Sequence, residues 1–360
     1  VLGVAGCTAL LLIGFGIQDS ILPIVDKQSE QLTHNDMTIV LSDEKALTME
    51  QGLADTLDSS SAVRSWGAFY TKSTTLYNEE GGSADVSIVG AEDDARMTEY
   101  FTFRTRVGHD PIPFEEDSVI LTEKTALNLG LSVGDTFYVE AADGSRVPLT
   151  LTGIAENYMF TRLYLSGAQL ESLLGGTPEW NTVYGLTGCA TEAEYNALRT
   201  KLLGCNYVSS VSFTEDTTSM FGSLIGSLNY VVVLIIVCAA ALAAVVLYNL
   251  ISVNLAERKK ELATIKVLGF YDKEVYRYIF REIELLSLIG SGVGLLLGVP
   301  LHRFIILTVE MDQLMFIRTI APRSYLLAVA LTMLFTVVVC FAMRRHVRHI
   351  SMVESMKAPE

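Results

Sequence analysis

The sequence lacks several signatures of enzymes and of nucleotide-binding proteins. It has no G-x-x-x-x-G-K-[ST] stretch, and so no P-loop with which to hold a nucleoside triphosphate. Its five histidines form no set with the spacing of metal ligands. We therefore expect a chain that is not an enzyme and that binds no cofactor or metal ion. Any ATP and Mg²⁺ chemistry should belong to a partner polypeptide.

One serine has the sequence context of a hydrolase nucleophile, but its surroundings have the wrong order. Gly130-Leu131-Ser132-Val133-Gly134 satisfies G-x-S-x-G. A nucleophile elbow requires a strand, then a sharp turn, then a helix. Here a short helix is predicted to end at Gly130 and a strand to follow the serine. The stretch therefore predicts a turn.

The few cysteines do not suggest a disulfide. Of the five, Cys7, Cys238 and Cys340 lie in apolar runs and are typical packing residues. Cys189 and Cys205 flank a helix that a capping box at Thr191 and Glu194 predicts. That helix would separate them by about 20 Å, whereas the Cα atoms of a disulfide lie within about 7 Å of each other.

Charge is absent from long stretches of the chain. The 360 residues are 50% hydrophobic, with a mean hydropathy of +0.37. Four apolar runs occur: Val1–Ile17, Tyr230–Ile251, Leu285–Leu301 and Tyr325–Met343. The second has no charged residue, and at about 1.5 Å per residue it is long enough to cross a bilayer core of roughly 30 Å. The pattern predicts a membrane protein with four spanning helices.

The charges that remain predict the orientation of the chain. The loop over 252–283 contains seven Lys/Arg residues, and the tail after the fourth run is also basic. The positive-inside rule places both in the cytoplasm of a plasma-membrane protein and residues 18–221 outside. Residues 1–221 hold 12 Lys/Arg and 31 Asp/Glu, a net charge of −19, which argues against nucleic acid as a partner.

The fold class predicted is α+β: four transmembrane helices, the first truncated, with an extracellular mixed α/β domain inserted between helices 1 and 2. The chain starts inside an apolar run, without Met or a basic flank, so we expect a fragment of a longer protein and a trimmed span rather than a signal peptide. The expected divisions are helix 1 over 1–17, the outer domain over 18–221, helix 2 over 222–253, a cytoplasmic coupling helix and connector over 254–281, helix 3 over 282–305, a short extracellular loop over 306–323, helix 4 over 324–343 and a basic tail over 344–360.

The outer region alternates strand and helix signals. A β-rich run predicts a strand over Val63–Tyr77, and Asp143-Gly144 predicts a hairpin. Thr48 with Gln51 predicts a capped helix to about Leu57. A helix over Glu192–Leu203 between two short strands predicts a β-α-β stretch. Most aromatic residues here should be core, although some could line a groove for a peptide or lipid.

Charge returns abruptly in Asn254–Phe270. Leu262, Ile265 and Leu268 recur at helical spacing beneath a row of charged residues. Gly269 follows, where the end of a helix favours a residue that tolerates positive φ. The segment predicts a short amphipathic helix on the membrane face, shaped to receive movement from a soluble partner.

The same segment resembles a known family. Glu257-Arg258-x-x-Glu261 followed by Lys266-x-x-Gly269 resembles the cytoplasmic motif of FtsX/MacB-type ABC transporter permeases, and the match continues through Arg281-Glu282. Leu129-Gly130-Leu131-x-Val133-Gly134-Asp135 resembles part of the extracellular core domain of MacB-type permeases. The resemblance implies a coupling helix that docks on an ATPase through Glu257, Arg258, Glu261, Leu262, Ile265, Lys266 and Gly269. Residues 18–110 resemble the family only loosely.

The third apolar run contains Gly290, Gly294 and Gly298, each four residues apart. Glycines at this spacing line one helix face and allow a neighbouring helix to approach closely. Two interpretations stay open: a sliding contact with another span, and ordinary helix packing.

Together these patterns predict the permease subunit of an FtsX/MacB-type ABC transporter. It would relay ATP-driven change from a cytoplasmic ATPase dimer to the outer domain, in export or release of a peptide, lipid or lipoprotein, or in resistance. A second permease unit, upstream in the same chain or as another copy, and membrane lipid would be further partners. The alternative is a membrane receptor whose outer domain binds a ligand and signals inward.

Overall fold

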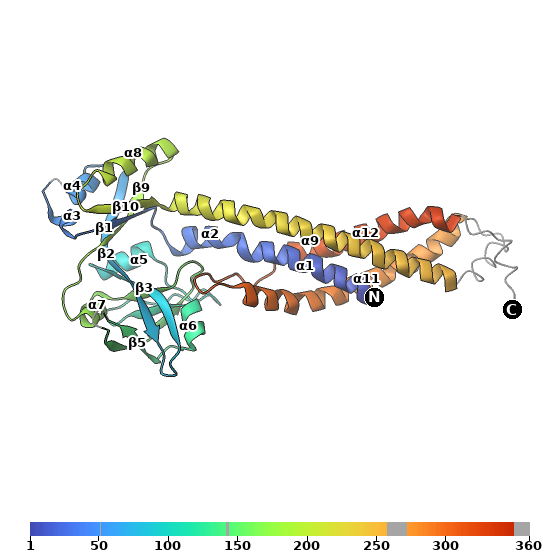
Figure 1. Ribbon diagram of the computed structural model, residues 1–360, viewed down its shortest axis with the longest axis horizontal. Coiled ribbons are helices and arrows are strands. Elements are labelled where there is room, and N and C mark those ends of the chain that lie inside the picture. Colours follow the sequence, from blue (N-terminus) through green and yellow to red (C-terminus); the bar gives the residue numbers. More distant parts are fainter. Residues whose placement is uncertain (51, 142–143, 258–271, 349–360) are drawn as a thin grey trace. The chain divides into compact units, whose positions relative to one another are not determined.

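The computed structural model describes residues 1–50, 52–141, 144–257 and 272–348, and Figure 1 labels many of their elements. The chain forms two compact units. The membrane unit comprises Val1–Leu22, Ile225–Val309 and Ile317–Glu360. The outer domain comprises Pro23–Leu224 together with Glu310–Phe316. One segment of the loop between the last two long helices is therefore part of the outer domain.

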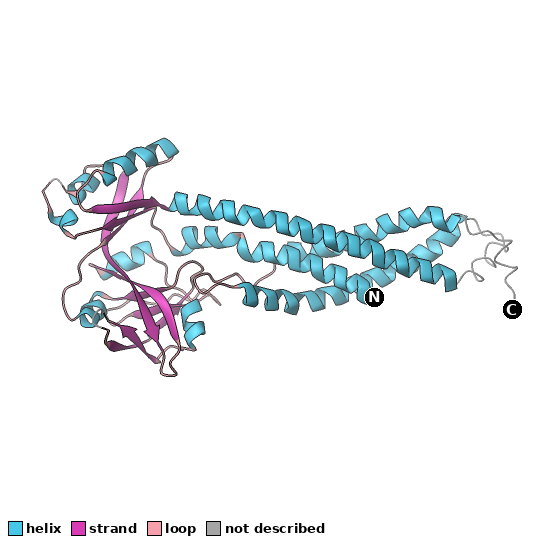
Figure 2. Cartoon of the chain, viewed as in Figure 1, coloured by secondary structure: helices cyan, strands magenta, loops and turns pink. Residues whose placement is uncertain are grey.

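The outer domain is a mixed sheet with short helices (Figure 2). Its strands are β1 Met37–Leu41, β2 Val63–Tyr77, β3 Ser83–Ala91, β4 Val119–Thr122, β5 Thr136–Glu140, β6 Arg146–Thr150, β7 Gly153–Ala155, β8 Arg162–Leu165, β9 Thr182–Thr187 and β10 Val208–Phe213. Its helices are α2 Pro23–Lys27, the π-helix η1 Gln28–Leu32, α3 Lys45–Thr48, α4 Leu53–Asp58, α5 Asp94–Tyr100, α6 Glu123–Leu129, α7 Gly167–Leu174 and α8 Glu192–Leu203. Strand order is β10-β1-β9-β2-β3-β8-β4-β7, while β5 pairs with both β2 and β6.

The long strand β2 holds the sheet together, and the sequence predicted its bounds. Its first half pairs antiparallel with β9, and Phe69–Tyr77 pairs antiparallel with β3. Separate hydrophobic clusters lie along it. One gathers β1, β9, β10, α4 and α8, and another gathers β3 to β6 with α6 and α7. A single strand of 15 residues therefore belongs to two packed regions.

Local capping chemistry explains several boundaries in the outer domain. The predicted capping box starts α8, because Thr191 Oγ1 accepts from Glu194 N and the Glu194 side chain accepts in return. The predicted β-α-β stretch is confirmed, with β1 between β9 and β10 and antiparallel to both. The helix predicted to run to about Leu57 is present as α4, but the start predicted for it at Thr48 is wrong. Thr48 ends α3, the chain becomes extended at Met49, and Gly52 begins α4 instead.

The serine in G-x-S-x-G lies in a turn, as predicted. Helix α6 ends at Leu129, Gly130 adopts φ +67° with a left-handed backbone, and β5 follows at Thr136. The backbone N–H of Ser132 donates to the Asp135 carboxylate, which fixes the turn. Cys189 and Cys205 are free thiols, so the expectation of no disulfide between them is confirmed.

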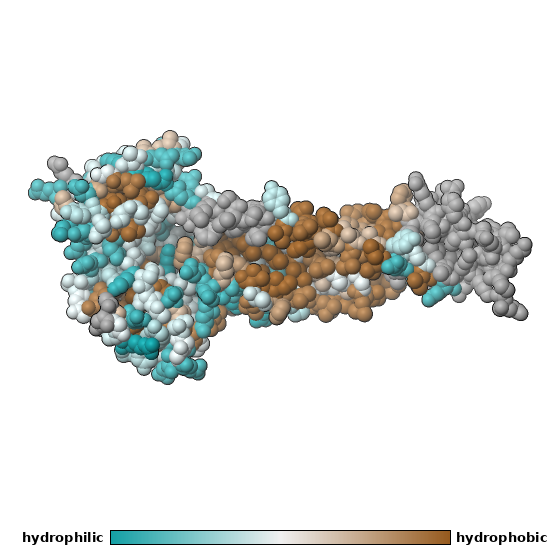
Figure 3. Space-filling model, viewed as in Figure 1, coloured by the Kyte–Doolittle hydropathy of each residue, from teal (hydrophilic) through white to brown (hydrophobic). Residues whose placement is uncertain are grey.

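The membrane unit contains four helices that are long and apolar enough to cross a membrane. They are α1 Leu2–Ile21, α9 Thr214–Glu257, α11 Asp272–Val309 and α12 Pro322–Arg348. They lie side by side (Figure 1), and apolar side chains cover their visible surface (Figure 3). The most apolar window of α1 is 61% buried, against 22% for each of the others. Helix α1 is therefore the one most enclosed by its neighbours.

Helical structure extends beyond the ranges expected for the spans. Helix α1 runs past residue 17 to Ile21, and α2 and η1 continue the chain to Leu32. Helix α11 starts at Asp272, before the range expected for the third span. These bounds are ends of helices, so the membrane ranges remain predictions. Of the coupling residues, only Glu257, the last residue of α9, is described. Arg258, Glu261, Leu262, Ile265, Lys266 and Gly269 lie outside the described residues.

Candidate functional site

The three glycines of α11 lie against α1. A Cβ atom on Gly294 would stand 2.6 Å from the Ala5 carbonyl oxygen, and one on Gly298 would stand 2.9 Å from Leu12 Cδ2. At Gly290 the closest atom, Val4 Cβ, would be 3.0 Å away. Gly292, on the same helix, has nothing within 4 Å of such an atom. The helices α1 and α11 approach closely because α11 presents no side chain at these three positions.

Polar contacts join α1 to its neighbours at two levels. Within the apolar run, the Thr8 hydroxyl group lies 3.0 Å from that of Thr332 on α12. At the outer end of α1, Asp19 accepts hydrogen bonds from Ala321 N at 3.0 Å and from the Ser324 hydroxyl group at 2.5 Å. Ile317 N donates to the Ser20 carbonyl group at 3.1 Å. Residues just before and at the start of α12 are therefore tied to α1.

The segment Glu310–Phe316, which we call the strap, is built into the outer domain by its main chain. Phe160 N donates to Gln313 O and Met315 N donates to Tyr158 O, each at 2.9 Å. Met159 and Leu314 form an antiparallel bridge. The strap was expected to be part of a short extracellular loop, and its pairing with the domain was not foreseen.

A buried ion pair adds to the strap's attachment. Lys124 Nζ lies 2.9 Å from Glu310 Oε2, and the two side chains are 12% and 2% exposed. The other oxygen of Glu310 accepts from Phe316 N at 2.8 Å. Removing one member of such a pair leaves a buried charge without compensation, which is costly. The strap is therefore held by charge as well as by main-chain pairing.

The strap pairs with Asn157–Phe160, which we call the junction loop. The Gln28 side-chain oxygen accepts from Tyr158 N at 2.9 Å, and its nitrogen donates to Asn157 Oδ1 at 2.8 Å. Asn157 Nδ2 in turn donates to the carbonyl groups of Met159 and Phe160. Phe160 has φ +65°, a left-handed conformation that non-glycine residues rarely adopt. The loop is thus held in an unusual shape by η1 on one side and by the strap on the other.

A buried carboxylate next to the junction loop is heavily hydrogen-bonded. Glu156 is 2% exposed and accepts from Arg104 Nε at 2.6 Å and from the Tyr158 hydroxyl group at 2.5 Å. Burial, and then the bond to this carboxylate, raise the pKa of Tyr158. The phenol therefore stays protonated and keeps donating at physiological pH. Among the residues that the structure describes, no group of three or more His, Cys, Asp or Glu side chains could hold a metal ion.

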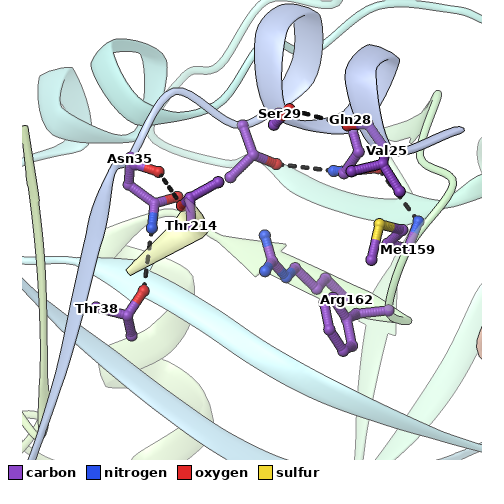
Figure 4. A pocket seen from close by; sticks show the side chains of 10 residues that line it. Val25, Gln28, Ser29, Asn35, Thr38, Met159, Arg162 and Thr214 are labelled. Atoms are coloured by element: carbon purple, nitrogen blue, oxygen red, sulfur yellow. Dashed lines mark hydrogen bonds between the residues drawn. The ribbon is translucent and has the colours of Figure 1, made fainter. Parts of the chain in front are cut away.

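A cavity of about 120 Å³ opens beside the junction loop (Figure 4). Gln28 and Ser29 of η1 line it, as do Met159 and Phe160 of the junction loop and Thr214, the first residue of α9. Thr214 is fixed by its hydroxyl group, which donates to Asn35 O at 2.6 Å. The lining therefore draws on the segment that follows α1, on the loop paired with the strap, and on the start of α9.

Sequence reasoning placed functional residues only in the membrane unit and the cytoplasmic segment. It missed the strap and Gln28, and of the junction loop it singled out only the aromatic residues Tyr158 and Phe160. Seven aromatic residues expected to be core or to line a groove are at least partly buried: Trp66, Phe69, Tyr70, Tyr100, Phe101, Phe103 and Tyr158. An eighth, Phe160, is 47% exposed and lines the cavity. A polar residue at the outer end of an apolar run, Asp19, was the one signal that could have directed attention to this region.

Comparison with known proteins identifies the chain. The model of the MacB-like periplasmic core domain matches residues 1–200, and that of the FtsX-like permease C-terminal domain matches residues 233–352. The chain belongs to the FtsX/MacB-type family of ABC transporter permeases. It is a multi-pass membrane protein with an extracytoplasmic domain, as the sequence predicted.

Three solved structures are similar to part of this chain. The periplasmic region of MacB from Actinobacillus actinomycetemcomitans has 13% identity, with 55% of this chain and 97% of that one covered, and a TM-score of 0.33. The extracellular domain of the noncanonic ABC-type transporter YknZ from Gram-positive bacteria has 15% identity, with coverage of 50% and 99%, and a TM-score of 0.31. A domain of a putative permease from Porphyromonas gingivalis has 13% identity, with coverage of 47% and 83%, and a TM-score of 0.27. A search of curated proteins finds no match.

Proposed function

We propose that this permease transmits ATP-driven movement from a separate cytoplasmic ATPase dimer to its outer domain, and that it does not hydrolyse ATP itself. The observation that carries the proposal is the strap. Seven residues between two membrane helices belong by their contacts to the outer domain. A movement of α11 or α12 therefore reaches the outer domain through the covalent chain and does not depend on non-covalent contacts at a surface.

The strap is suited to transmit displacement because it is attached at several points. Main-chain hydrogen bonds to Tyr158 and Phe160 are supplemented by the buried pair between Lys124 and Glu310. Each net hydrogen bond contributes on the order of 1 kcal/mol. Together these contacts favour movement of strap and junction loop as one body over local detachment.

The membrane helices supply the input to this connection. Helix α1 contacts the glycine face of α11 directly, and Asp19 holds the residues at the start of α12. Side chains at a helix interface interlock in discrete arrangements, whereas a glycine face presents little to interlock. This favours sliding of α11 along α1, one of the two interpretations that the glycine spacing left open.

The cytoplasmic input would come through Asn254–Phe270. By resemblance to the family, Glu257, Arg258, Glu261 and Lys266 face the ATPase or support the face toward it. Rim ion pairs at such an interface contribute little affinity but fix the docking register. The output is a change in the outer domain that releases or exports a peptide, a lipid or a lipoprotein.

Two substitutions in the coupling segment test this proposal. Gly269→Val removes the residue suited to a left-handed backbone, and Glu261→Lys reverses a docking charge. Each variant should keep the circular dichroism spectrum of the full chain but lose stimulation of the co-purified ATPase. Gly292→Val, at a glycine with open space around it, is the matched control and should behave like the parent. If both coupling variants stimulate the ATPase and support function like the parent, the coupling role is wrong.

A further inference from the structure

The cavity beside the junction loop contains an arginine whose charge has no counter-charge. Figure 4 shows the Arg162 guanidinium group extending between Gln28 on one side and Asn35 with Thr214 on the other. Its Nη1 atom is buried and has no hydrogen-bond partner in the described part of the chain. No acidic residue lines the cavity, and no ion pair to Arg162 exists among the described residues. This is unusual in a region with 31 acidic residues against 12 basic ones.

The groups that surround the guanidinium group compensate its charge only in part. Its carbon lies 5.4 Å from the Phe101 ring centre and 5.8 Å from that of Phe160, where an aromatic face attracts a cation. The Tyr164 side chain is hydrogen-bonded to the guanidinium group, and Tyr184 also interacts with its charge. Burial raises the pKa of Tyr184, so its phenol remains neutral at physiological pH. A buried donor left without an acceptor costs stability, unless a ligand supplies the acceptor.

Two hydroxyl groups on the cavity wall can donate to the same ligand. Thr33 Oγ1 accepts from Gln28 Nε2 at 2.7 Å, and Thr38 Oγ1 accepts from Asn35 Nδ2 at 3.0 Å. In neither of these bonds is the hydroxyl proton used, and no other bond from either hydroxyl group occurs among the described residues. Both residues line the cavity with Arg162. The wall therefore offers one cationic fork, two hydroxyl donors and the apolar side chains of Val25, Met159 and Phe160.

We propose that this cavity binds the carboxylate group of a small ligand with an apolar body, such as the C-terminal residue of a peptide. The planar guanidinium fork matches a planar carboxylate, which can accept two parallel hydrogen bonds. One arginine neutralises a single negative charge. A phosphate group, with close to two charges, would leave an excess of negative charge in an acidic domain. The volume of about 120 Å³ is several times the roughly 10–15 Å³ that a cavity needs to hold one water molecule, so it has room for a carboxylate and a few carbon atoms.

The position of the cavity gives such a ligand a role, and this part rests on the proposed function. Its walls come from η1, from the junction loop and from the start of α9. A ligand that binds one arrangement of these walls more tightly shifts the equilibrium toward that arrangement. The same junction loop is hydrogen-bonded to the strap. Occupancy of the cavity therefore changes how readily the membrane helices move, and so the rate of ATP hydrolysis by the partner.

Binding is tested with the full chain in detergent, using N-acetyl-leucine as the probe and N-acetyl-leucinamide as its uncharged counterpart. Saturation-transfer NMR titrations should give saturable binding of the acid, with a dissociation constant on the order of 1 mM or tighter. The amide, and the acid with Arg162→Met, should bind at least about tenfold more weakly, because a hydrogen bond between charged groups is lost. Arg146→Met is the control, since Arg146 also stacks on a ring, that of Tyr77, but lies outside the cavity.

Several results would overturn the site: no saturable binding of the acid by the parent, equal binding of acid and amide, or unchanged binding by Arg162→Met. Displacement of the probe by an equal or lower concentration of inorganic phosphate would overturn the choice of a carboxylate. If Arg162→Met does not fold, two measurements still test the site. Arg162→Lys keeps the charge but loses the fork, so it should bind the acid more weakly than the parent, and the parent should bind the acid more tightly than the amide. The ATPase rate of the co-purified complex should change with N-acetyl-leucine in the parent and in Arg146→Met, but not in Arg162→Met. Binding without any change in rate would remove the regulatory role, whereas failure of the coupling variants would remove the proposed function and leave the site.

Discussion

The membrane unit and the outer domain are each stabilised internally by a different kind of interaction. In the outer domain, strand pairing and an aromatic core are joined by buried ion pairs and multiple side-chain hydrogen bonds. In the membrane unit, α1 and α11 meet over three glycines, and polar contacts gather at a few points such as Thr8 and Asp19. The first region is specified by many directional contacts and the second by close backbone approach.

This difference predicts which substitutions each region tolerates. A packed glycine face cannot absorb an added side chain without moving a helix, because the added atoms would meet both backbone and side-chain atoms of α1 at close range. A hydrogen-bonded loop loses one contact at a time, and each loss has a bounded cost. Substitutions in the two regions should therefore differ in magnitude, and matched controls exist in each.

The largest effect is expected for Gly294→Leu in the membrane unit. Its Cβ alone would stand 2.6 Å from the Ala5 carbonyl oxygen and 2.7 Å from Thr8 Cβ. We predict that α1 and α11 separate and that the chain no longer assembles with its ATPase, measured by co-purification. Gly292→Leu, where nothing lies within 4 Å, should assemble normally. Normal assembly and activity of Gly294→Leu would mean that the glycine face is not a required contact.

The next effect is expected for Lys124→Met in the outer domain. It removes the ammonium group that faces the buried Glu310 carboxylate, which should lower the free energy of unfolding by about 3 kcal/mol. The loss of stability is measured by thermal unfolding of the full chain, with proteolysis of the outer domain as the readout. Lys45→Met removes an exposed pair with Asp43 and should leave stability unchanged. Equal behaviour of the two variants would show that the strap does not depend on this ion pair.

A smaller effect is expected for Asn157→Ala in the junction loop. The loss of donors to Met159 O and Phe160 O should lower the free energy of unfolding by about 1–2 kcal/mol. It should also increase hydrogen exchange of the backbone around Phe160. Asn196→Ala, at an exposed residue of α8, serves as the control. If the amide exchange of the loop is the same in both variants, Asn157 does not maintain its shape.

The smallest effect concerns thiols, and it also tests the orientation. Burial raises the pKa of the Cys189 thiol, so this side chain should react slowly with an impermeant thiol reagent. Ser83→Cys places a thiol at an exposed position and should be labelled rapidly on intact cells. Lys259→Cys, in the basic loop, should not be labelled there. Labelling of residue 259 but not of residue 83 would reverse the orientation.

Local patterns in the sequence predicted the outer domain's elements better than its connections. The strand over Val63–Tyr77 and the capping box at Thr191 are short-range signals, and the structure confirms both. The helix start predicted at Thr48 was wrong because the capping pattern there coincides with the end of α3, where the chain becomes extended at Met49. The predicted end near Leu57 agrees with α4.

The candidate site depends on contacts that no local signal carries. Glycine spacing identified a face of α11, but only the structure shows that α1 covers it. The pairing of the strap with the junction loop joins residues far apart in the sequence through main-chain atoms, which are the same in every residue. The charge of Arg162 became informative only once the absence of a counter-charge among the described residues was known.

The central claim is that movement of the membrane helices reaches the outer domain through the strap. Hydrogen–deuterium exchange of the full complex, with and without ATP turnover, tests it most directly at the amides of Phe160 and Met315, whose hydrogen bonds join strap and junction loop. We predict that turnover changes exchange in peptides over 156–162 and 310–317, while peptides from the hairpin of β5 and β6 stay unchanged. Identical exchange of the first two regions in both states, during active hydrolysis of ATP, would contradict the account.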